Sequence, residues 1–521
     1  MTASADANMG SERGTGPLLG RTAAGAGLAG VLSGAVALGT AEVLRRLVPR
    51  PSLVLAVGEV VISKVPAGVA DTAIAMFGRN DKTVLVIGIT VVSLVLAAAV
   101  GIAARRRHWV APVGFGLAAA AGIGAGISRS SAAPLATVLV GVGGAGAGVL
   151  CLRGLLNPRR RPAEAVDSRR RFLRVGAAAA GAGVVAAAAG RRLAQRVHLG
   201  TDPGDVRLAS PAAPRPQPGR SATVDVPGVS PLFTSNRSFY RIDTALIVPR
   251  VDISAWRLGV TGMVARPFAL SYRELSALPQ IEADITISCV SNDVGGDLVG
   301  TARWQGILLT DLLQRARSRP GANQVVGRSL DGWTAGFPTA LALDGRRAMV
   351  ALGMNGNPLP LDHGFPARLV VPGLYGYVSA TKWLHQIELT TFEAFDGYWV
   401  PRGWAKDGPI KITSRIDVPR PGASLRAGRL PVAGVAWAPH RGIARVEVSV
   451  DGGPWVDAAL ADAVGDDAWR QWRYQWDAGP GAHELRVRAT DRAGQVQVGT
   501  HSPLKPSGAT GYHIIRVRVH A

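Results

Sequence analysis

The chain has 521 residues, of which 47% are hydrophobic and 18% are charged, and its mean hydropathy is +0.19. This composition is too apolar for a disordered chain or an ordinary water-soluble protein, so part of the chain must lie in lipid. Residues 1–200 hold 23 basic and 8 acidic side chains, an excess typical of a membrane anchor, and no nucleic-acid partner is expected. The only two cysteines, Cys151 and Cys289, lie in different halves, which excludes a disulfide framework.

Four uncharged apolar runs in the first part of the chain are each long enough to cross a bilayer, at roughly 20 residues. They are residues 22–41, 83–104, 109–127 and 134–152. Between the first two runs, residues 51–78 are apolar but are interrupted by charges and by Pro66, which favours an interfacial or re-entrant segment. We therefore expect residues 1–165 to form a membrane domain of about four helices in contact with the lipid bilayer.

Basic clusters set the expected orientation of these helices. They follow the second and fourth runs, at residues 105–107 and at 153 and 159–161. By the positive-inside rule these loops and the N-terminus lie in the cytoplasm, although Arg45, Arg46 and Arg50 then lie on the opposite side. The glycines at 141–146 match the dinucleotide pattern GxGxxG, but they lie inside an apolar run, so we expect close helix packing there.

Residues 168–174, Ser-Arg-Arg-Arg-Phe-Leu-Arg, precede a weakly hydrophobic run at 175–190 and resemble a twin-arginine export signal. The alternative is a basic cytoplasmic loop before a fifth helix. On either interpretation, residues 166–200 form a signal or anchor helix that carries the rest of the chain outward. We expect a multi-pass protein of the plasma membrane whose C-terminal part is extracytoplasmic.

The remaining 320 or so residues divide into three parts by pattern. Residues 201–231 are a proline-rich linker. Residues 232–415 mix strand-like runs with a helical run at 308–316, as in an α+β domain; the strand-like runs are 256–261, 284–290, 367–371 and 384–389. Residues 416–521 contain alternating runs at 445–450, 483–489 and 514–519, which predict a small antiparallel β-sandwich of the immunoglobulin-like type.

Few residues in the α+β part could carry chemistry. The sequence has no CxxCH, HExxH, P-loop or GxSxG motif, so haem attachment, metalloprotease, NTPase and α/β-hydrolase functions lack support. Cys289 ends an alternating run and precedes a loop that contains Gly295 and Gly296. From these facts alone, its thiol is either a metal ligand or nucleophile, or a buried apolar side chain.

A collinear series of motifs resembles the sulfite oxidase family of molybdopterin-dependent oxidoreductases. The motifs are TSNRSFYR at 234–241, SCVSN at 288–292, TARWQG at 301–306, MNGNPLPLDHGFPAR at 354–368, VPGLYG at 371–376, KWL at 382–384 and VSVDGG at 448–453. The resemblance covers residues 232–521. It implies a molybdopterin-binding catalytic domain followed by an immunoglobulin-like domain of the kind that forms homodimers.

The resemblance also implies a cofactor and its ligands. The family's molybdenum is held by a pterin dithiolene and one protein thiolate, and Cys289 stands in the thiolate position. His363 and Arg368 match positions used for the pterin and its phosphate. The other positions implied for the cofactor are Asn236, Tyr240, Arg241, Asn292, Asp331, Ser379, Thr381 and Lys382. Because the chain lacks haem, iron–sulfur and flavin motifs, we expect a separate electron-transfer partner, such as a quinone, a cytochrome or a membrane subunit.

The sequence departs from the family where sulfite enzymes place arginines and a tyrosine around their anion. The corresponding positions fall within residues 292–295, at Ile242 or Asp243 with Arg241 offset, at Trp404 and at Ser507. Each change removes a positive charge or a hydroxyl, and Asp243 or Asp293 would repel sulfite. We therefore expect oxygen-atom transfer on a neutral, less polar substrate, such as a sulfoxide or another oxo compound.

Three other interpretations remain open at this point. The chain could be a sulfite-oxidising enzyme with an altered anion site, or a cofactor-less binding protein of the cell envelope. The membrane part could instead be the functional part, as a channel or transporter, but its apolar runs lack ionisable residues.

Overall fold

The computed structural model describes residues 22–47, 52–65, 81–129, 134–156, 200–246 and 248–521, together with residues 69, 72, 76 and 77. The chain divides into two compact units, residues 1–198 and 199–521, and each is described by itself. The segment that resembles a twin-arginine signal lies outside the described residues.

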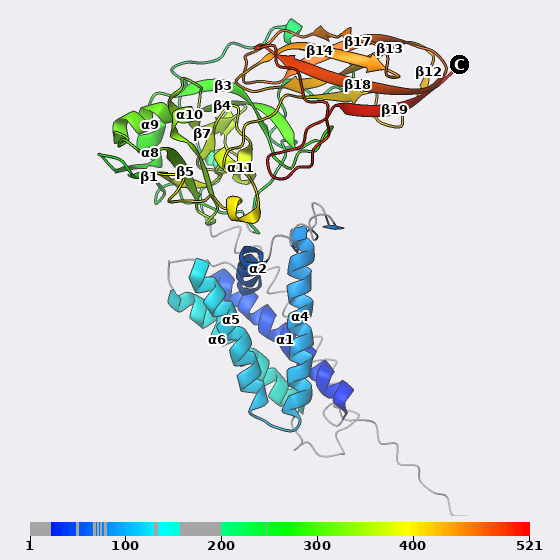
Figure 1. The fold of residues 1–521 in the computed structure, drawn as a ribbon. Helices are drawn as coiled ribbons and strands as arrows, with labels where there is room; N and C mark the ends of the chain where they lie inside the picture. Colours follow the sequence, from blue (N-terminus) through cyan, green and yellow to red (C-terminus); the bar gives the residue numbers. More distant parts are fainter. Residues whose placement is uncertain are drawn as a thin grey trace, which may run out of the picture. The chain divides into compact units, whose positions relative to one another are not determined.

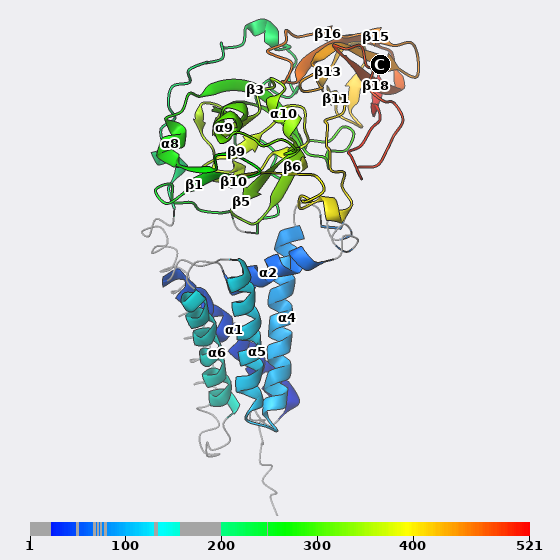
Figure 2. The ribbon, with the colours of Figure 1, turned by 60° about the vertical axis from the view of Figure 1, so that its left-hand side comes forward.

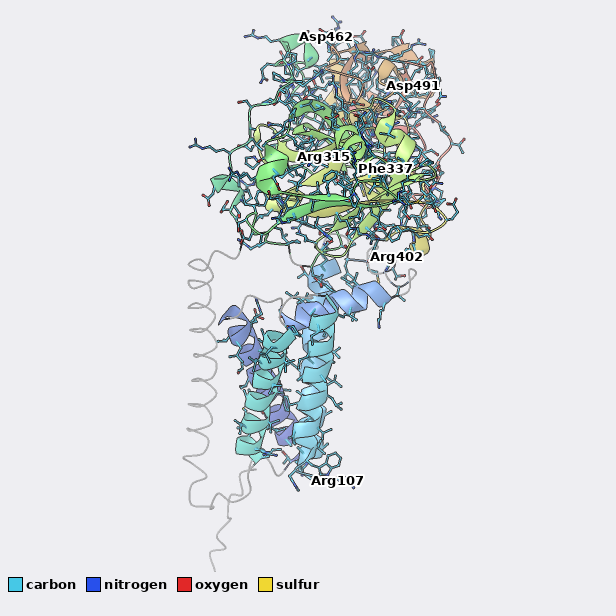
Figure 3. All side chains as sticks on the ribbon, turned by 90° about the vertical axis from the view of Figure 1, so that its left-hand side faces the viewer. Arg107, Arg315, Phe337, Arg402, Asp462 and Asp491 are labelled. Atoms are coloured by element: carbon cyan, nitrogen blue, oxygen red, sulfur yellow. The ribbon has the colours of Figure 1, made fainter. Side chains whose placement is uncertain are left out.

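The first unit is a bundle of apolar helices (Figure 1). Among the described residues, four helices are long and apolar enough to cross a membrane, as the sequence predicts; they are α1 (Ala23–Leu47), α4 (Asp81–Ala104), α5 (Val110–Arg129) and α6 (Pro134–Leu156). Helix α2 (Leu53–Lys64) has 12 residues, which is too short for a span. Arg107 lies at the end of the bundle where α4 turns into α5 (Figure 3).

Glycines allow these helices to pack closely. A Cβ atom added at Gly30 of α1 would lie 2.1 Å from the carbonyl oxygen of Ala97 in α4. One added at Gly144 of α6 would lie 2.9 Å from the carbonyl oxygen of Ala37 in α1. The glycine-rich stretch of α6 therefore packs against a neighbouring helix, which confirms the expectation for residues 141–146.

The second unit begins with two sheets and four short helices (Figure 2). One sheet has the order β2-β1-β10-β5-β6, with β1 and β10 parallel; its strands are β1 (Arg257–Gly262), β2 (Phe268–Ser271), β5 (Gln324–Ser329), β6 (Thr334–Pro338) and β10 (Leu384–Thr390). The other has the order β3-β4-β7-β8, with β9 also on β7; its strands are β3 (Ile281–Ser288), β4 (Val299–Leu308), β7 (Met349–Met354), β8 (Asn357–Pro358) and β9 (Arg368–Val370). The helices are α8 (Tyr272–Ser276), α9 (Leu309–Ala316), α10 (Thr339–Leu343) and α11 (Gly376–Ser379), and the 3-10 turns are η3 (Pro203–Asp205), η4 (Arg220–Ala222), η5 (Leu361–His363) and η6 (Val400–Arg402).

Strand β3 differs from its expected pattern. Polar and apolar residues alternate at 284–289, a pattern typical of a strand with one face in water. In the structure, however, Asp284, Thr286 and Ser288 are all buried. Each buried polar group needs a partner. Asp284 pairs with Arg303 at 2.7 Å, and the Thr286 hydroxyl accepts a hydrogen bond from the backbone N–H of Trp469 at 2.7 Å. The alternation in β3 therefore reflects contacts with other parts of the unit and not exposure to water.

The C-terminal part consists of two further sheets that enclose their own apolar core, which includes Trp472 and Val446. One sheet has the order β11-β13-β17-β16, with β11 (Thr413–Val418), β13 (Gly428–Trp437), β16 (Ala459–Leu460) and β17 (Arg470–Ala478). The other has the order β12-β19-β18-β14-β15, with β12 (Ser424–Arg426), β14 (Ile443–Val450), β15 (Val456–Asp457), β18 (Gly481–Asp491) and β19 (His513–His520). The boundary expected between residues 415 and 416 falls inside β11, so the C-terminal sheets begin at Thr413.

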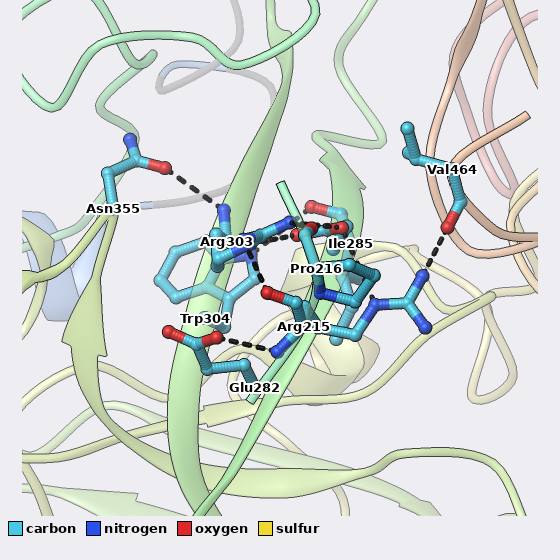
Figure 4. A network of polar contacts seen from close by, with 9 residues as sticks. Arg215, Pro216, Glu282, Ile285, Arg303, Trp304, Asn355 and Val464 are labelled. Carbon is cyan, nitrogen blue, oxygen red and sulfur yellow. Dashed lines mark hydrogen bonds and ion pairs between the residues drawn. The ribbon is translucent and has the colours of Figure 1, made fainter. Parts of the chain in front are cut away.

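The sequence predicts a free, proline-rich linker at residues 201–231. In the structure, residues 200–231, here called the strap, are instead hydrogen-bonded to other parts of the second unit. Arg303 of β4 donates to the carbonyl oxygens of Arg215 at 3.1 Å and Pro216 at 2.9 Å, and the backbone N–H of Arg215 donates to Glu282 at 2.8 Å (Figure 4). Composition predicts flexibility, but these partly buried hydrogen bonds hold the strap to β3 and β4 of the second unit.

Candidate functional site

Cys289 directly follows β3 and opens a loop, residues 289–298, that closes on itself. Its backbone N–H donates to the carbonyl of Leu298 at 2.9 Å, and its carbonyl accepts from the N–H of Asn292 at 3.1 Å. The Sγ atom accepts from the N–H of Ser291 at 3.4 Å. Burial raises the pKa of the Cys289 thiol, so formation of the thiolate requires a nearby positive charge such as a metal ion.

Cys289 lies in the wall of a pocket that contains about 840 Å³ of space between atoms, part of which is open solvent. Its wall contains Phe239, Tyr240, Ile242, Asp243, Thr244, Cys289, Val290, Ser291, Ser329, Asp331, Trp333, Arg368, Gly376, Tyr377, Ala380, Lys382, Trp383, Trp399 and Trp404. Two cations, Arg368 and Lys382, and two carboxylates, Asp243 and Asp331, stand in this wall, so its formal charges balance.

Lys382 is buried beside a carboxylate. Its Nζ atom donates to Asp243 Oδ2 and to the carbonyl oxygen of Asp362, both at 3.0 Å. Burial lowers the pKa of Lys382 to about 8, while the Asp243 carboxylate opposes that shift. The same carboxylate accepts from Arg241 Nε at 2.9 Å. Asp243 therefore lies between two cations.

Arg368 is a buried cation with an incomplete set of protein partners. It donates to the carbonyl oxygen of His363 at 3.2 Å and lies 5.0 Å from the ring of Trp304, but its buried Nε has no acceptor among the described residues. Burial lowers the pKa of Arg368 to about 10. A buried guanidinium that keeps a free donor in a pocket wall suits an anionic group such as a phosphate.

His363 contacts Arg368, whose guanidinium donates to the His363 carbonyl oxygen. Its Nε2 is 2.8 Å from the carbonyl oxygen of Asn236, and its buried Nδ1 has no partner within the part of the chain that the structure describes. Burial, reinforced by Arg368, lowers the pKa of His363 to about 4, which keeps the ring neutral at pH 7. A neutral ring with an unused nitrogen fits a hydrogen bond to a bound group.

Seven residues of the wall are aromatic. Tyr240 stacks on Phe239 with ring centroids 5.3 Å apart, and burial raises the pKa of its phenol. In a second aromatic group, the ring centroids of Tyr377 and Trp399 lie 5.7 Å and 6.5 Å from that of Trp404. This part of the pocket offers apolar surface and few charges.

The structure brings together five of the residues that the sequence assigns to the site. Cys289, Tyr240, Asp331, Arg368 and Lys382 line the pocket. The other six lie outside its wall: Asn236, Arg241, Asn292, His363, Ser379 and Thr381.

Several of these six have partners within the protein. The Asn292 side chain accepts from Leu298 N–H at 2.7 Å and helps to close the Cys289 loop. The Ser379 hydroxyl donates to the Tyr375 carbonyl at 3.1 Å. The Asn236 amide donates to the Met354 carbonyl at 3.1 Å.

Sequence reasoning missed most of the aromatic wall. Trp333, Tyr377 and Trp399 were not selected, although the density of aromatic residues between 398 and 404 was a usable signal. Of the positions that depart from the sulfite enzymes, Ile242, Asp243 and Trp404 line the pocket, whereas Asp293 and Ser507 do not. Of Asp243 and Asp293, the two carboxylates at the departing positions, only Asp243 therefore lines the pocket.

The C-terminal sheets also contact the Cys289 loop. Gly295 has a φ of +78°, and a Cβ atom added there would lie 2.4 Å from the ring of His513 in β19. The His513 ring is held in place because its Nδ1 accepts from the N–H of Ile416 at 3.0 Å. The loop after the cysteine thus packs against residues more than 200 positions further along the chain.

The donor set around Cys289 suits a metal that arrives with a ligand of its own. Over the ranges that the structure describes, no three His, Cys, Asp or Glu side chains are placed to hold a metal ion together. A metal bound to the Cys289 sulfur would take its other ligands from a non-protein group. The free nitrogens of Arg368 and His363 are suited to hold such a group by its polar atoms.

Comparison with known proteins agrees with this geometry. Residues 245–399 match the family model of the oxidoreductase molybdopterin binding domain. The chain is 30% identical over 329 residues to the mitochondrial sulfite oxidase of Mus musculus, covering 53% of this chain and 59% of that protein. It is 31% identical over 325 residues to the sulfite oxidase of Gallus gallus, covering 52% and 69%. An uncharacterized oxidoreductase of Bacillus subtilis, YuiH, is 33% identical over 191 residues, covering 36% and 93%.

The match spans less than two thirds of the mouse protein's length. Among solved structures, the sulfane dehydrogenase SoxCD from Paracoccus pantotrophus aligns with 23% identity and a TM-score of 0.46, covering 52% of this chain and 75% of that one.

Proposed function

The chain belongs to the sulfite oxidase family of molybdopterin-dependent oxidoreductases, and we propose that it catalyses two-electron oxygen-atom transfer on a substrate other than sulfite. The observation that carries this proposal is the pocket beside Cys289, whose wall has balanced formal charges and includes seven aromatic residues. When bound, the cofactor supplies a molybdenum centre that accepts or donates two electrons together with an oxygen atom.

In this proposal the chain's own residues hold the cofactor and shape the substrate space. Cys289 supplies the protein thiolate, and Arg368 and His363 bind the pterin and its phosphate. Lys382 contributes to the cofactor-binding wall of the pocket. Tyr240 and Asp331 complete the wall, while Asn236, Arg241, Asn292, Ser379 and Thr381 support it from behind. The free Nε of buried Arg368 favours this assignment because an anion there would satisfy it.

The substrate follows from the charges at the pocket. A small dianion requires a surplus of positive charge, but Lys382 is already paired with Asp243 at 3.0 Å. Trp333, Trp399 and Trp404 provide apolar contact surface in its place. We infer a neutral, less polar substrate such as a sulfoxide or a related oxo compound. A sulfite-oxidising enzyme with an altered anion site is the alternative of the same reaction class.

Electron transfer needs a second component. The sequence has no haem, iron–sulfur or flavin motif. A quinone, a cytochrome or a membrane subunit would exchange electrons with the metal centre.

We infer that helices α1, α4, α5 and α6 anchor the enzyme in the plasma membrane as a multi-pass protein with an extracytoplasmic catalytic part. Their length and hydropathy support the anchor. The arginine pattern at 168–174 supports export by the twin-arginine route.

We propose that the C-terminal sheets form an immunoglobulin-like sandwich and that they mediate a homodimer. The supporting observation is two sheets that enclose one apolar core, with every pairing antiparallel except that of β12 with β19. The oligomeric state in solution tests this part of the proposal separately.

The first experiment measures the molybdenum and pterin bound by the purified full-length chain and by its Cys289→Ser variant, made in a host that synthesises the cofactor. Near-stoichiometric metal and pterin are expected, with an altered spectroscopic signature of the metal in the variant. Cys151→Ser is the matched control because it removes the other thiol, and its signature should be unchanged. Folded protein without metal or pterin would instead favour a cofactor-less binding protein, and sulfite turnover at ordinary enzyme rates would refute the substrate assignment.

A further inference from the structure

Asp243 is a buried carboxylate in the pocket wall with a cation on each side. Its side chain is only 6% exposed, and its Oδ2 atom accepts from Lys382 Nζ at 3.0 Å and from Arg241 Nε at 2.9 Å. Burial of a charge is unfavourable unless it is paired, and here both ion pairs satisfy one carboxylate.

The two cations differ in their access to the pocket. Lys382 stands in the wall and is buried, whereas Arg241 lies outside the wall with a side chain that is 39% exposed. Lys382 has a second acceptor, the carbonyl oxygen of Asp362 at 3.0 Å, and its ammonium lies 5.4 Å from the ring centroid of Trp383. The ammonium is thus held in position by groups on two sides.

We propose that Asp243 determines the specificity of the pocket by excluding small inorganic anions. It does so because it accepts hydrogen bonds from the ammonium of Lys382 and the guanidinium of Arg241 and brings its own negative charge to the wall. The inference rests on the proposed function, since it names the residue that makes a neutral substrate preferable to sulfite at the same site.

The physical argument compares two ligands. An oxyanion that enters the pocket must displace the Asp243 carboxylate from Lys382 or remain without that donor, and it meets a like charge at close range. A neutral oxo compound meets neither obstacle, because it brings no charge to be compensated. Replacing Asp243 with a neutral residue would remove one negative charge from the wall, whatever group Arg368 binds.

The other carboxylates near these cations cannot substitute for Asp243. Asp331 accepts from the backbone N–H of Trp333 at 3.0 Å and holds a turn. The Asp362 side chain is 54% exposed and lies 3.7 Å from Arg241, outside the wall. Solvent screens its charge, so its contribution to the pocket is small.

The test compares Asp243→Asn with Asp362→Asn in the full-length holoenzyme. Dissociation constants for sulfate and for sulfite are measured by calorimetry at pH 6, below the value of about 8 to which burial lowers the pKa of Lys382. We expect Asp243→Asn to bind both anions about tenfold more tightly than the wild type, equivalent to about 1.4 kcal/mol. Asp362→Asn should stay within about twofold of the wild type.

A second pair of variants separates the loss of charge from a general disturbance. Asp243→Ser retains an oxygen for Lys382 but no charge, and it should show the same gain in anion affinity. Asp243→Glu retains the charge and should bind anions as weakly as the wild type. Molybdenum content is measured for every variant, and unchanged anion affinity in the neutral variant that retains its cofactor would overturn the proposal.

The result is distinguishable from a failure of the proposed function. If the wild-type enzyme turns over sulfite at ordinary rates, the substrate assignment fails whatever Asp243 does. If the wild type ignores sulfite and the neutral variants gain no anion affinity, the assignment stands, and the role given to Asp243 is wrong.

Discussion

Arg415 in β11 donates from Nη1 to the carbonyl oxygen of Gly296 at 2.7 Å, so a residue of the C-terminal sheets holds the loop that begins at Cys289. The same guanidinium donates to the Ser230 hydroxyl and pairs with Asp417, each at 2.7 Å. One buried side chain thus joins the cysteine loop, the strap and β11.

Replacing Arg415 with Gln should destabilise the second unit and loosen the Cys289 loop. The Asp417 side chain is only 8% exposed and would lose its cation, and the expected loss is about 3 kcal/mol of the free energy of unfolding. Tryptophan fluorescence follows this unit because 11 of the 12 tryptophans lie after residue 239. Arg429→Gln is the control, since the Arg429 side chain is 77% exposed and 3.6 Å from Asp477. Equal melting temperatures for the two variants would contradict the role given to Arg415.

A pair of glycine substitutions tests the contact between the loop and β19. Gly295 and Gly494 have φ values of +78° and +81°, so alanine at either position carries a similar backbone strain, of about 1 kcal/mol. Only at Gly295 would the new methyl group meet the His513 ring, because nothing lies within 4 Å of a Cβ atom at Gly494. Gly295→Ala should cost roughly 1–3 kcal/mol more than Gly494→Ala, measured by chemical denaturation. No difference between them would show that the loop can move away from β19 freely.

Removal of the Arg303 side chain should release the strap. Arg303 forms a two-point pair with Asp284, at 2.7 Å and 3.0 Å, in addition to its two bonds to the strap. Arg303→Met would leave Asp284 buried without its main partner, at an expected cost of about 3–5 kcal/mol. Trypsin should then cut the strap after Arg207 or Arg220 much faster than in the wild type. Arg319→Met, at an exposed position, should leave the cleavage rate unchanged.

His513 makes stability depend on pH. Burial, reinforced by Arg415, lowers its pKa from 6.5 to about 4, so the unfolded chain binds a proton between these values that the folded chain does not. Stability therefore falls as the pH drops below 6.5, by about 2 kcal/mol at pH 5 from this residue. In His513→Asn, the amide oxygen can still accept a hydrogen bond from the Ile416 N–H, but the side chain does not bind a proton in this pH range. Its melting temperature should fall less than that of the wild type between pH 7 and pH 5, and parallel curves would refute the assignment.

The elements that the sequence predicts well are those with one apolar and one solvated face. β18 and β19 alternate in burial as their sequences predict. β14 was predicted from the same alternation of residue types, although Glu447 and Ser449 on its polar side are buried. The sequence does not predict β4, because nine of its ten residues are buried and its polar and apolar residues therefore do not alternate as they do in a half-exposed strand. The sequence predicts a free linker in place of the strap, because proline content indicates the backbone conformation of a segment but not its hydrogen-bond partners.

The site was predictable only in part, for a related reason. Motif order identified Cys289, Arg368 and Lys382, which share the pocket. The pairing of Asp243 with Lys382 spans 139 positions, and no local pattern signals it. Trp399 and Trp404 belong to a segment with little regular structure, where periodicity carries no information.

The contacts across the second unit set an order for its biosynthesis. The Cys289 loop leaves the ribosome before Arg415, which is 119 positions beyond Gly296, and Thr286 precedes its partner Trp469 by 183. At about 5–20 residues per second, translation needs roughly 6–24 s to cover the first of these intervals. During that time the cysteine is synthesised, but the groups that hold its loop do not yet exist. The loop that begins at Cys289 therefore gains these contacts only when the C-terminal sheets have been translated and folded.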